Sequence, residues 1–230
     1  MAKLVWDQAG ERTYETGVSE CALYVASSGT YPTGVAWNGL TGVTESPSGA
    51  EETPLYANNS KYLSMRSAEE LGGTIEAYTY PDEWAQCDGS ASLTTGVHVG
   101  QQSRKTFGLA YKTVVGNDSD GEAYGYKLHL IYGATASPSE RAYATINDSP
   151  EAITFSWEFQ TTPVEIPSTV GSFKKTSCIT IDTTELTSGK ENANLKALEE
   201  VLYGTQSATA RLPLPQEVYQ IMTGAHGTTT

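Results

Sequence analysis

The chain has 230 residues and a formal net charge of −13, with 14 Lys and Arg residues against 27 Asp and Glu residues. This balance argues against binding nucleic acid through its phosphates, which requires a basic surface. The length allows one large all-β domain, and 14 tyrosines, 22 glycines and 10 prolines are typical of many strands joined by many turns.

The cysteines and the N-terminus bear on where the protein is made. Cys21, Cys87 and Cys178 form an odd, widely spaced set, which argues against a disulfide framework and a zinc site. No apolar run is long enough to span a membrane, and the first 15 residues lack the apolar core of a signal peptide. We therefore expect synthesis in a cytoplasm without export by the usual route.

The first 20 residues are predicted to form a polar, acidic arm around Trp6. Residues 4–6 are a candidate short edge strand. The arm is either loosely ordered or docked on a neighbour, and the sequence leaves both interpretations open. Strands are then predicted at 21–25 and 35–43, the second interrupted by glycines.

Residues 45–60, ESPSGAEETPLYANNS, are the longest stretch without a regular pattern. Loops of this length in a compact domain are usually functional or disordered. We predict that this loop projects and contacts an adjacent subunit, with Leu55 and Tyr56 as apolar anchors. The acidic members of this candidate site are Glu45, Glu51 and Glu52. Further strands are predicted at 61–66 and 74–80, and a short helix opens at residue 81.

Residues 104–163 organise the chain, because their pattern predicts four strands joined by turns. Apolar and polar residues alternate around residues 107–112, 126–132 and 153–160, which indicates one buried face in each strand. A shorter strand is predicted at 141–146. Turn residues separate the strands at 116–121, 137–139 and 147–150. The predicted core residues are Leu128, Leu130, Ile153, Phe155, Trp157 and Phe159.

The C-terminal part follows an irregular stretch at 164–177. A strand is predicted at 178–182, and one clear helix at about 190–203, where Leu195, Leu198 and Leu202 recur at helical spacing. Gly204 occupies the expected C-cap position. A final helical turn is possible near residues 218–222, and residues 223–230 are expected to be a flexible tail.

No motif predicts catalysis or metal binding. Residues 116–122, GNDSDGE, weakly resemble a calcium loop, but alignment puts Gly116 and Lys127 at ligand positions, so a hairpin turn is favoured. The three histidines, His98, His129 and His226, lack metal-ligand spacing. Nucleophile-elbow, dinucleotide and P-loop motifs are missing from the sequence. We expect no enzyme activity and no cofactor.

Most of the chain resembles the major tail protein, or tail tube protein, of long-tailed bacteriophages with non-contractile tails. The resemblance begins at MAKLVWDQAGERTYETGV and includes GVAWNGLTGVTESPSGAEETPLYANN, IEAYTYPDEWAQCDG, TFGLAYKTVVGND and YGYKLHLIYGATASPSERAYATINDSPEAITFSWEFQTTPV. It extends to LKALEEVLYGT and ARLPLP near the end. These are structural rather than catalytic motifs, so the match rests on its extent.

The resemblance implies a single domain over residues 1–230, an antiparallel two-sheet β-sandwich with one flanking α-helix. It implies a structural virion protein assembled in the host bacterial cytoplasm. Six copies would form a ring whose sheets close a barrel around a lumen, and stacked rings would form the tail tube through which DNA passes. The implied partners are other copies of the chain, tail-tip proteins and tape-measure proteins.

In such a tube we predict a net negative lumen, because like charge would keep DNA sliding instead of gripping its phosphates. Glu76 and Glu158 are the candidate lumen-lining residues, since each lies mid-strand beside core-facing neighbours. The alternative is that they pair with Lys127 or Lys112 across strands. Two rival functions also remain: a carbohydrate-binding β-sandwich, which would expose aromatic residues in a groove, and a hydrolase with perturbed carboxylates in a deep cleft.

Overall fold

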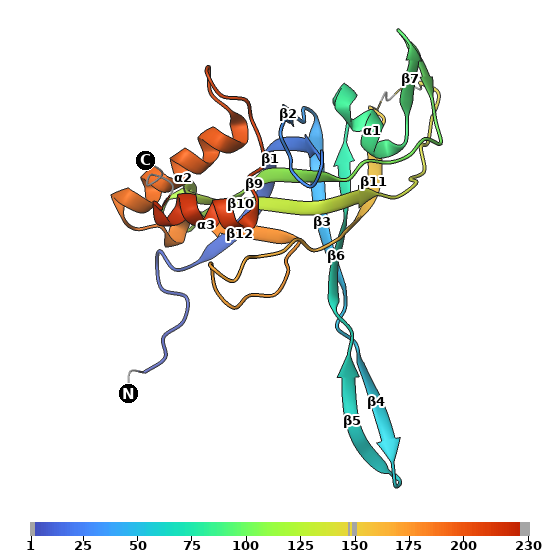
Figure 1. The fold of residues 1–230 in the computed structure, drawn as a ribbon. Coiled ribbons are helices and arrows are strands. Elements are labelled where there is room, and N and C mark those ends of the chain that lie inside the picture. Colours follow the sequence, from blue (N-terminus) through green and yellow to red (C-terminus); the bar gives the residue numbers. More distant parts are fainter. Residues whose placement is uncertain (1–2, 147, 149–150, 226–230) are drawn as a thin grey trace.

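The computed structural model describes residues 3–146, 148 and 151–225, and it is mainly β with antiparallel strand pairs (Figure 1). The strands are β1 (Thr13–Val25), β2 (Gly34–Ala36), β3 (Leu40–Gly49), β4 (Glu52–Ala57), β5 (Ser60–Arg66), β6 (Glu69–Ala77), β7 (Ala91–Thr94), β8 (Val97–Val99), β9 (Phe107–Asn117), β10 (Gly121–Ala136), β11 (Phe155–Thr161) and β12 (Cys178–Asp182). The helices are α1 (Ala85–Asp88), α2 (Gly189–Tyr203) and α3 (Pro215–Thr223), with 3-10 turns η1 (Asp82–Trp84) and η2 (Thr183–Glu185).

One eight-stranded sheet contains most of the strands, in the order β2-β1-β9-β10-β11-β6-β3, with β12 also pairing with β10. The path is open, with β2 and β3 at its two ends. Two further two-stranded sheets, β4–β5 and β7–β8, lie outside it. The predicted turn at 116–121 is confirmed as the hairpin between β9 and β10, where Gly121 pairs with Asn117.

A bend in β10 changes the direction of the sheet. Before the bend β10 pairs with β12, and after it with β11. Gly133 lies at this point with a φ of +64°, and a Cβ there would lie 2.1 Å from the carbonyl oxygen of Thr162. Glycine is therefore required both by the left-handed backbone and by the close approach of the neighbouring chain. The bend carries β11, β6 and β3 over one face of β1, β9 and β10.

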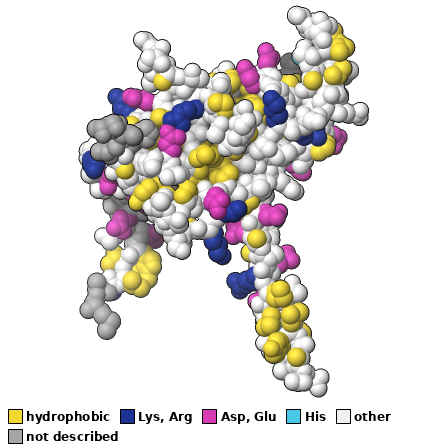
Figure 2. All heavy atoms as spheres, in the orientation of Figure 1, with side chains coloured by type: hydrophobic (Ala, Val, Ile, Leu, Met, Phe, Trp, Pro, Cys, Tyr) yellow, Lys and Arg dark blue, Asp and Glu magenta, His cyan; other side chains and the backbone are white. Residues whose placement is uncertain are grey.

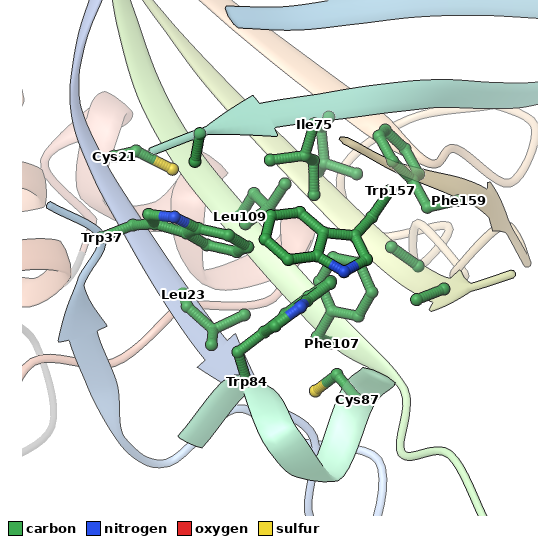
Figure 3. Close-up of a cluster of buried hydrophobic side chains, with 14 of the residues drawn as sticks. Cys21, Leu23, Trp37, Ile75, Trp84, Cys87, Phe107, Leu109, Trp157 and Phe159 are labelled. Carbon is green, nitrogen blue, oxygen red and sulfur yellow. The ribbon is translucent and has the colours of Figure 1, made fainter. Parts of the chain in front are cut away.

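The first core lies between these two parts of the sheet and is rich in aromatic residues (Figure 3). Trp157 is 1% exposed and its ring centroid lies 5.4 Å from that of Trp84 and 5.8 Å from that of Trp37. Trp84 comes from η1, so the short helical segment closes one side of this core. Figure 3 shows the three indole rings pointing toward one another from different elements.

The second core lies on the opposite face of β1, β9 and β10, under α2 and α3. The sequence pattern predicted one buried face for β9, but residues 107–111 are buried on both faces. Small residues make this possible: a Cβ on Gly108 would lie 2.4 Å from Leu212 Cδ2, so the segment before α3 packs directly on the strand. The helix predicted from leucine spacing is confirmed, with Leu195, Leu198 and Leu202 buried.

Four of the six predicted core residues are confirmed as buried, namely Leu128, Leu130, Trp157 and Phe159. Phe155 is half-buried and packs against the first core. The prediction for Ile153 is wrong, because its side chain is 38% exposed. β11 begins only at Phe155, which pairs with the last residue of β6, so the chain before it has no neighbouring strand to continue the alternation.

Three further predictions need correction. Residues 141–146 form no strand, since the pairing of β10 with β11 ends at Ala136. Residues 4–6 form no edge strand either. The resemblance implied one flanking α-helix, whereas the described part of the chain has α3 beside α2, because the turn predicted near 218–222 extends to a helix over residues 215–223. The short helix predicted to open at residue 81 is confirmed by η1 and α1. The predicted tail residues 226–230 and most of the turn predicted at 147–150 lie outside the described residues.

Candidate interaction surfaces

A long two-stranded arm projects from the body where the sequence predicted an irregular loop (Figure 1). β3 and β6 remain paired from Leu40 to Gly49, and β4 and β5 continue the projection. The prediction of projection is therefore confirmed, whereas the absence of regular structure is wrong. Asn58 and Asn59 form the tip turn with φ values of +49° and +61°, the geometry that favours Asn in two-residue hairpins.

The projecting arm, residues 51–67, exposes apolar side chains, which Figure 2 shows along the face that is in view. By register, Leu55 is opposite Leu63 and Thr53 is opposite Met65, so Leu55, Leu63 and Met65 share one face. The exposed fractions are 43% for Leu55, 70% for Tyr56, 72% for Tyr62, 41% for Leu63 and 59% for Met65. Within 53–65 the only charged residue is Lys61, which pairs with Glu52. This composition is typical of a surface that another molecule covers.

Glu45 belongs to the base of the arm, unlike Glu51, Glu52, Leu55 and Tyr56, which lie on its projecting part. Its carboxylate points back to the body, where the Tyr111 hydroxyl donates a hydrogen bond of 2.6 Å to Glu45 Oε1. The structure thus places Glu45 among the residues that fix the direction of the arm.

His129 lies beside this contact and links three elements. Its ring stacks on that of Tyr111, with centroids 4.7 Å apart. Nε2 lies 2.9 Å from Thr113 Oγ1 and 3.7 Å from Glu15 Oε1, and Nδ1 lies 3.9 Å from Glu45 Oε1. Burial lowers the pKa of His129, although the two carboxylates act in the opposite direction.

The outward face of β3, β6 and β11 is polar and acidic. Glu76 is opposite Ser156, and Thr74 lies between Thr44 and Glu158. The residues that share this face by register are Gly42, Thr44, Ser46, Ser48, Glu70, Gly72, Thr74, Glu76, Ser156, Glu158 and Gln160. The charged residues in this set are all carboxylates, which fits the prediction that acidic side chains outnumber basic ones on the non-core face.

The alternative pairing of Glu76 and Glu158 with lysines does not occur. Lys127 Nζ lies 2.7 Å from Glu15 Oε2, and Lys112 Nζ lies 2.6 Å from Glu199 Oε1 and 2.8 Å from Glu20 Oε2. Lys112 also lies over the Tyr126 ring, 4.5 Å from its centroid, and its ion pair with Glu199 helps to hold α2 on the sheet. Glu76 and Glu158 are both exposed, and the described residues provide neither with an ion pair.

Metal coordination and membrane insertion would each need a recognisable feature in the described part of the chain. Within it, no group of three His, Cys, Asp or Glu side chains is placed to hold a metal ion. The same residues include no helix with both the length and the apolar character to cross a membrane. Trp157 is buried in the first core and therefore offers no surface to a ligand. No protein-family model matches this chain, and no curated protein matches it.

Two features of these surfaces were not anticipated from the sequence. Tyr62, Leu63 and Met65 were assigned to an ordinary strand, although they form half of the exposed arm. The Asn-Asn pair at 58–59 was the available signal, because it marks a tight hairpin turn between two strands. The hairpin β7–β8 was also missed, and its polar residues at 92, 94 and 95 gave no clear alternation.

Proposed function

We propose that this protein is a structural virion protein that polymerises as stacked hexameric rings into a bacteriophage tail tube, the channel through which DNA enters the host. The resemblance described above supplies the architecture. The structural observation that supports it most is the arm of residues 51–67, whose apolar side chains the same chain does not cover. A surface of this kind needs a partner, and a second copy of the chain is the partner that the proposal provides.

The fold is compatible with the sandwich that the resemblance implies, because two parts of one sheet face each other across the first core. In the proposed ring, the open sheet would be completed by neighbouring copies, which removes the exposed strand edges that promote irregular aggregation. The acidic face of β3, β6 and β11 would then line the lumen. Carboxylates there would act on DNA only near the wall, because charge is screened over about 8–10 Å at physiological salt.

Electron microscopy of the purified chain tests the proposal directly. We expect tubes or rings at high protein concentration, if necessary after addition of tail-tip complex as a nucleus and with tape-measure protein setting the length. A chain that stays monomeric under all of these conditions and binds an oligosaccharide would instead support the carbohydrate-binding alternative.

The arm provides a second, independent test. Replacing residues 51–67 with a short Gly-Ser linker should leave the body folded, because both cores lie outside the arm. The far-ultraviolet circular dichroism of the monomer should lose only the contribution of β4 and β5. Tube growth should stop, and normal tubes from this variant would contradict the proposed role of the arm.

A further inference from the structure

The described part of the chain carries two hairpins outside the main sheet, and they lie at opposite ends of the molecule (Figure 1). β4–β5 forms the end of the arm, and β7–β8 projects beyond α1 at the other end. An isolated two-stranded hairpin is only marginally stable in water, so each gains from a surface that packs against it. Both also expose apolar side chains.

The end that carries β7–β8 has its own set of uncovered apolar residues. Leu93 is 71% exposed and Val97 is 46% exposed, on adjacent strands of this hairpin. The segment of residues 137–146 lies beside the base of the same hairpin, because Arg141 pairs with Asp88 in α1. This segment contributes Tyr143 and Ile146, which are 72% and 89% exposed. We call Leu93, Val97, Tyr143 and Ile146 the receiving end.

We propose that the receiving end binds the arm of the next copy of this chain, so that β4–β5 of one copy packs on β7–β8 of another. This inference deepens the proposed function and rests on it. Because the two surfaces differ and lie at opposite ends, the contact joins copies head to tail. A heterologous contact of this kind does not close on itself and produces an open, extendable assembly.

The charges of the two surfaces favour the same pairing. The chain carries a net charge of −13, so most pairs of surfaces from two copies repel each other. Residues 53–65 of the arm are an exception, since their single charged residue is Lys61. Asp82 and Glu83 lie in η1, directly before α1 at this end of the molecule; both are exposed, and the described residues give them no ion pair. Because Lys61 pairs with Glu52 of the same arm, the arm meets this end as an apolar surface without excess charge, and so without the repulsion that an acidic surface would cause.

Three matched substitutions test the proposal, each placing a carboxylate on an exposed apolar side chain. Tyr62→Asp changes the arm, Leu93→Asp changes the receiving end, and Phe173→Asp is the control. Phe173 is 65% exposed and lines an apolar groove beside α3 and β12, away from both hairpins. Tyr62→Asp and Leu93→Asp should each raise the protein concentration needed for tube growth by at least about tenfold, whereas Phe173→Asp should not. Unchanged circular dichroism would confirm that all three fold.

Mixing the two blocked variants gives the sharper result. The intact arm of Leu93→Asp can bind the intact receiving end of Tyr62→Asp, but neither product can extend further. The mixture should therefore give assemblies that stop at two units, whether the unit is a ring or a single chain. Sedimentation velocity and electron microscopy would measure their size. Each variant alone should give no such pairs.

The outcomes separate this inference from the proposed function. If Leu93→Asp forms tubes at wild-type concentrations and Tyr62→Asp forms none, the arm does not bind the receiving end, although the proposal of a tube still stands. If only Tyr62→Asp and Phe173→Asp lose tubes, the arm binds the groove beside α3 and β12 instead. That result would also overturn the inference that the arm binds the receiving end. A wild-type chain that never associates would overturn both proposals.

Discussion

Replacing Trp157 with alanine tests the central structural feature, the aromatic core between the two parts of the sheet. The side chain is 1% exposed, and four aromatic rings lie within 6 Å of its centroid, those of Trp37, Tyr80, Trp84 and Phe155. A buried aromatic side chain removes about 150–250 Å² from water, which at about 25 cal/mol/Å² gives an upper estimate of about 4–6 kcal/mol. Measured Trp→Ala costs of about 3–5 kcal/mol agree with it.

Urea and thermal unfolding of the monomer, followed by far-ultraviolet circular dichroism, would measure this effect. The thermal midpoint should fall by about 6–20 °C, since about 2–4 °C corresponds to 1 kcal/mol in a chain of this size. Ile153→Ala is the control, because Ile153 is 38% exposed and outside the strand, and should change stability by less than about 1 kcal/mol. A loss below about 1 kcal/mol for Trp157→Ala, or an equal loss for both variants, would refute this account of the core.

Three other substitutions address the bend, the arm base and the lumen. Gly133→Ala should destabilise the fold by more than about 2 kcal/mol, because its Cβ would clash with backbone, whereas Gly96→Ala, at φ +77° in open space, should cost only about 1 kcal/mol in urea unfolding. Burial lowers the pKa of His129 in the folded state, so its contribution to stability is present at neutral pH and is lost as pH falls below about 6.5. His129→Gln should therefore make the urea midpoint depend less on pH between about pH 7 and 5.5. In the proposed tail tube, the Glu76→Lys and Glu158→Lys double variant should still assemble but should slow genome delivery timed after adsorption, and unchanged delivery would remove this pair from the proposed lumen.

The sequence predicted those strands and that helix that bury one face and expose the other, because burial then follows the alternation or helical spacing of apolar residues. Trp157 and Phe159 follow this rule, as do the three leucines of α2. The rule failed where tertiary contacts determine burial. Residues 107–111 are buried on both faces, because the segment before α3 covers Gly108 and the second core covers Ala110. In the sequence, these two small residues between larger apolar ones gave the alternation of a strand with only one buried face.

The arm shows a different limit of sequence reasoning. Residues 45–60 contain prolines, glycine and an Asn pair, all typical of loops, yet they form strands. Pro47 is tolerated because β3 is an edge strand with a single partner, and Pro54 because β4 belongs to a two-stranded sheet. Exposed strands bury little, so they lack the apolar alternation by which strands are recognised. The projection was therefore located correctly, while its strand structure and its second half, residues 60–66, were not; its contact with another subunit stays a prediction.

The thinness of the arm has a consequence for how the proposed tube would grow. A fully buried apolar side chain contributes about 1.5–3 kcal/mol, but the arm exposes only a few, and association costs about 4–15 kcal/mol in lost freedom and ordering. One arm contact would then be weak, whereas six arms held in a ring would bind together with a high effective concentration. Doping wild-type protein with the variant that lacks residues 51–67 should accordingly reduce growth more steeply than in proportion to its fraction, because one armless copy weakens the whole ring. Growth that falls only linearly with the armless fraction, measured by light scattering, would show that the arms act one at a time.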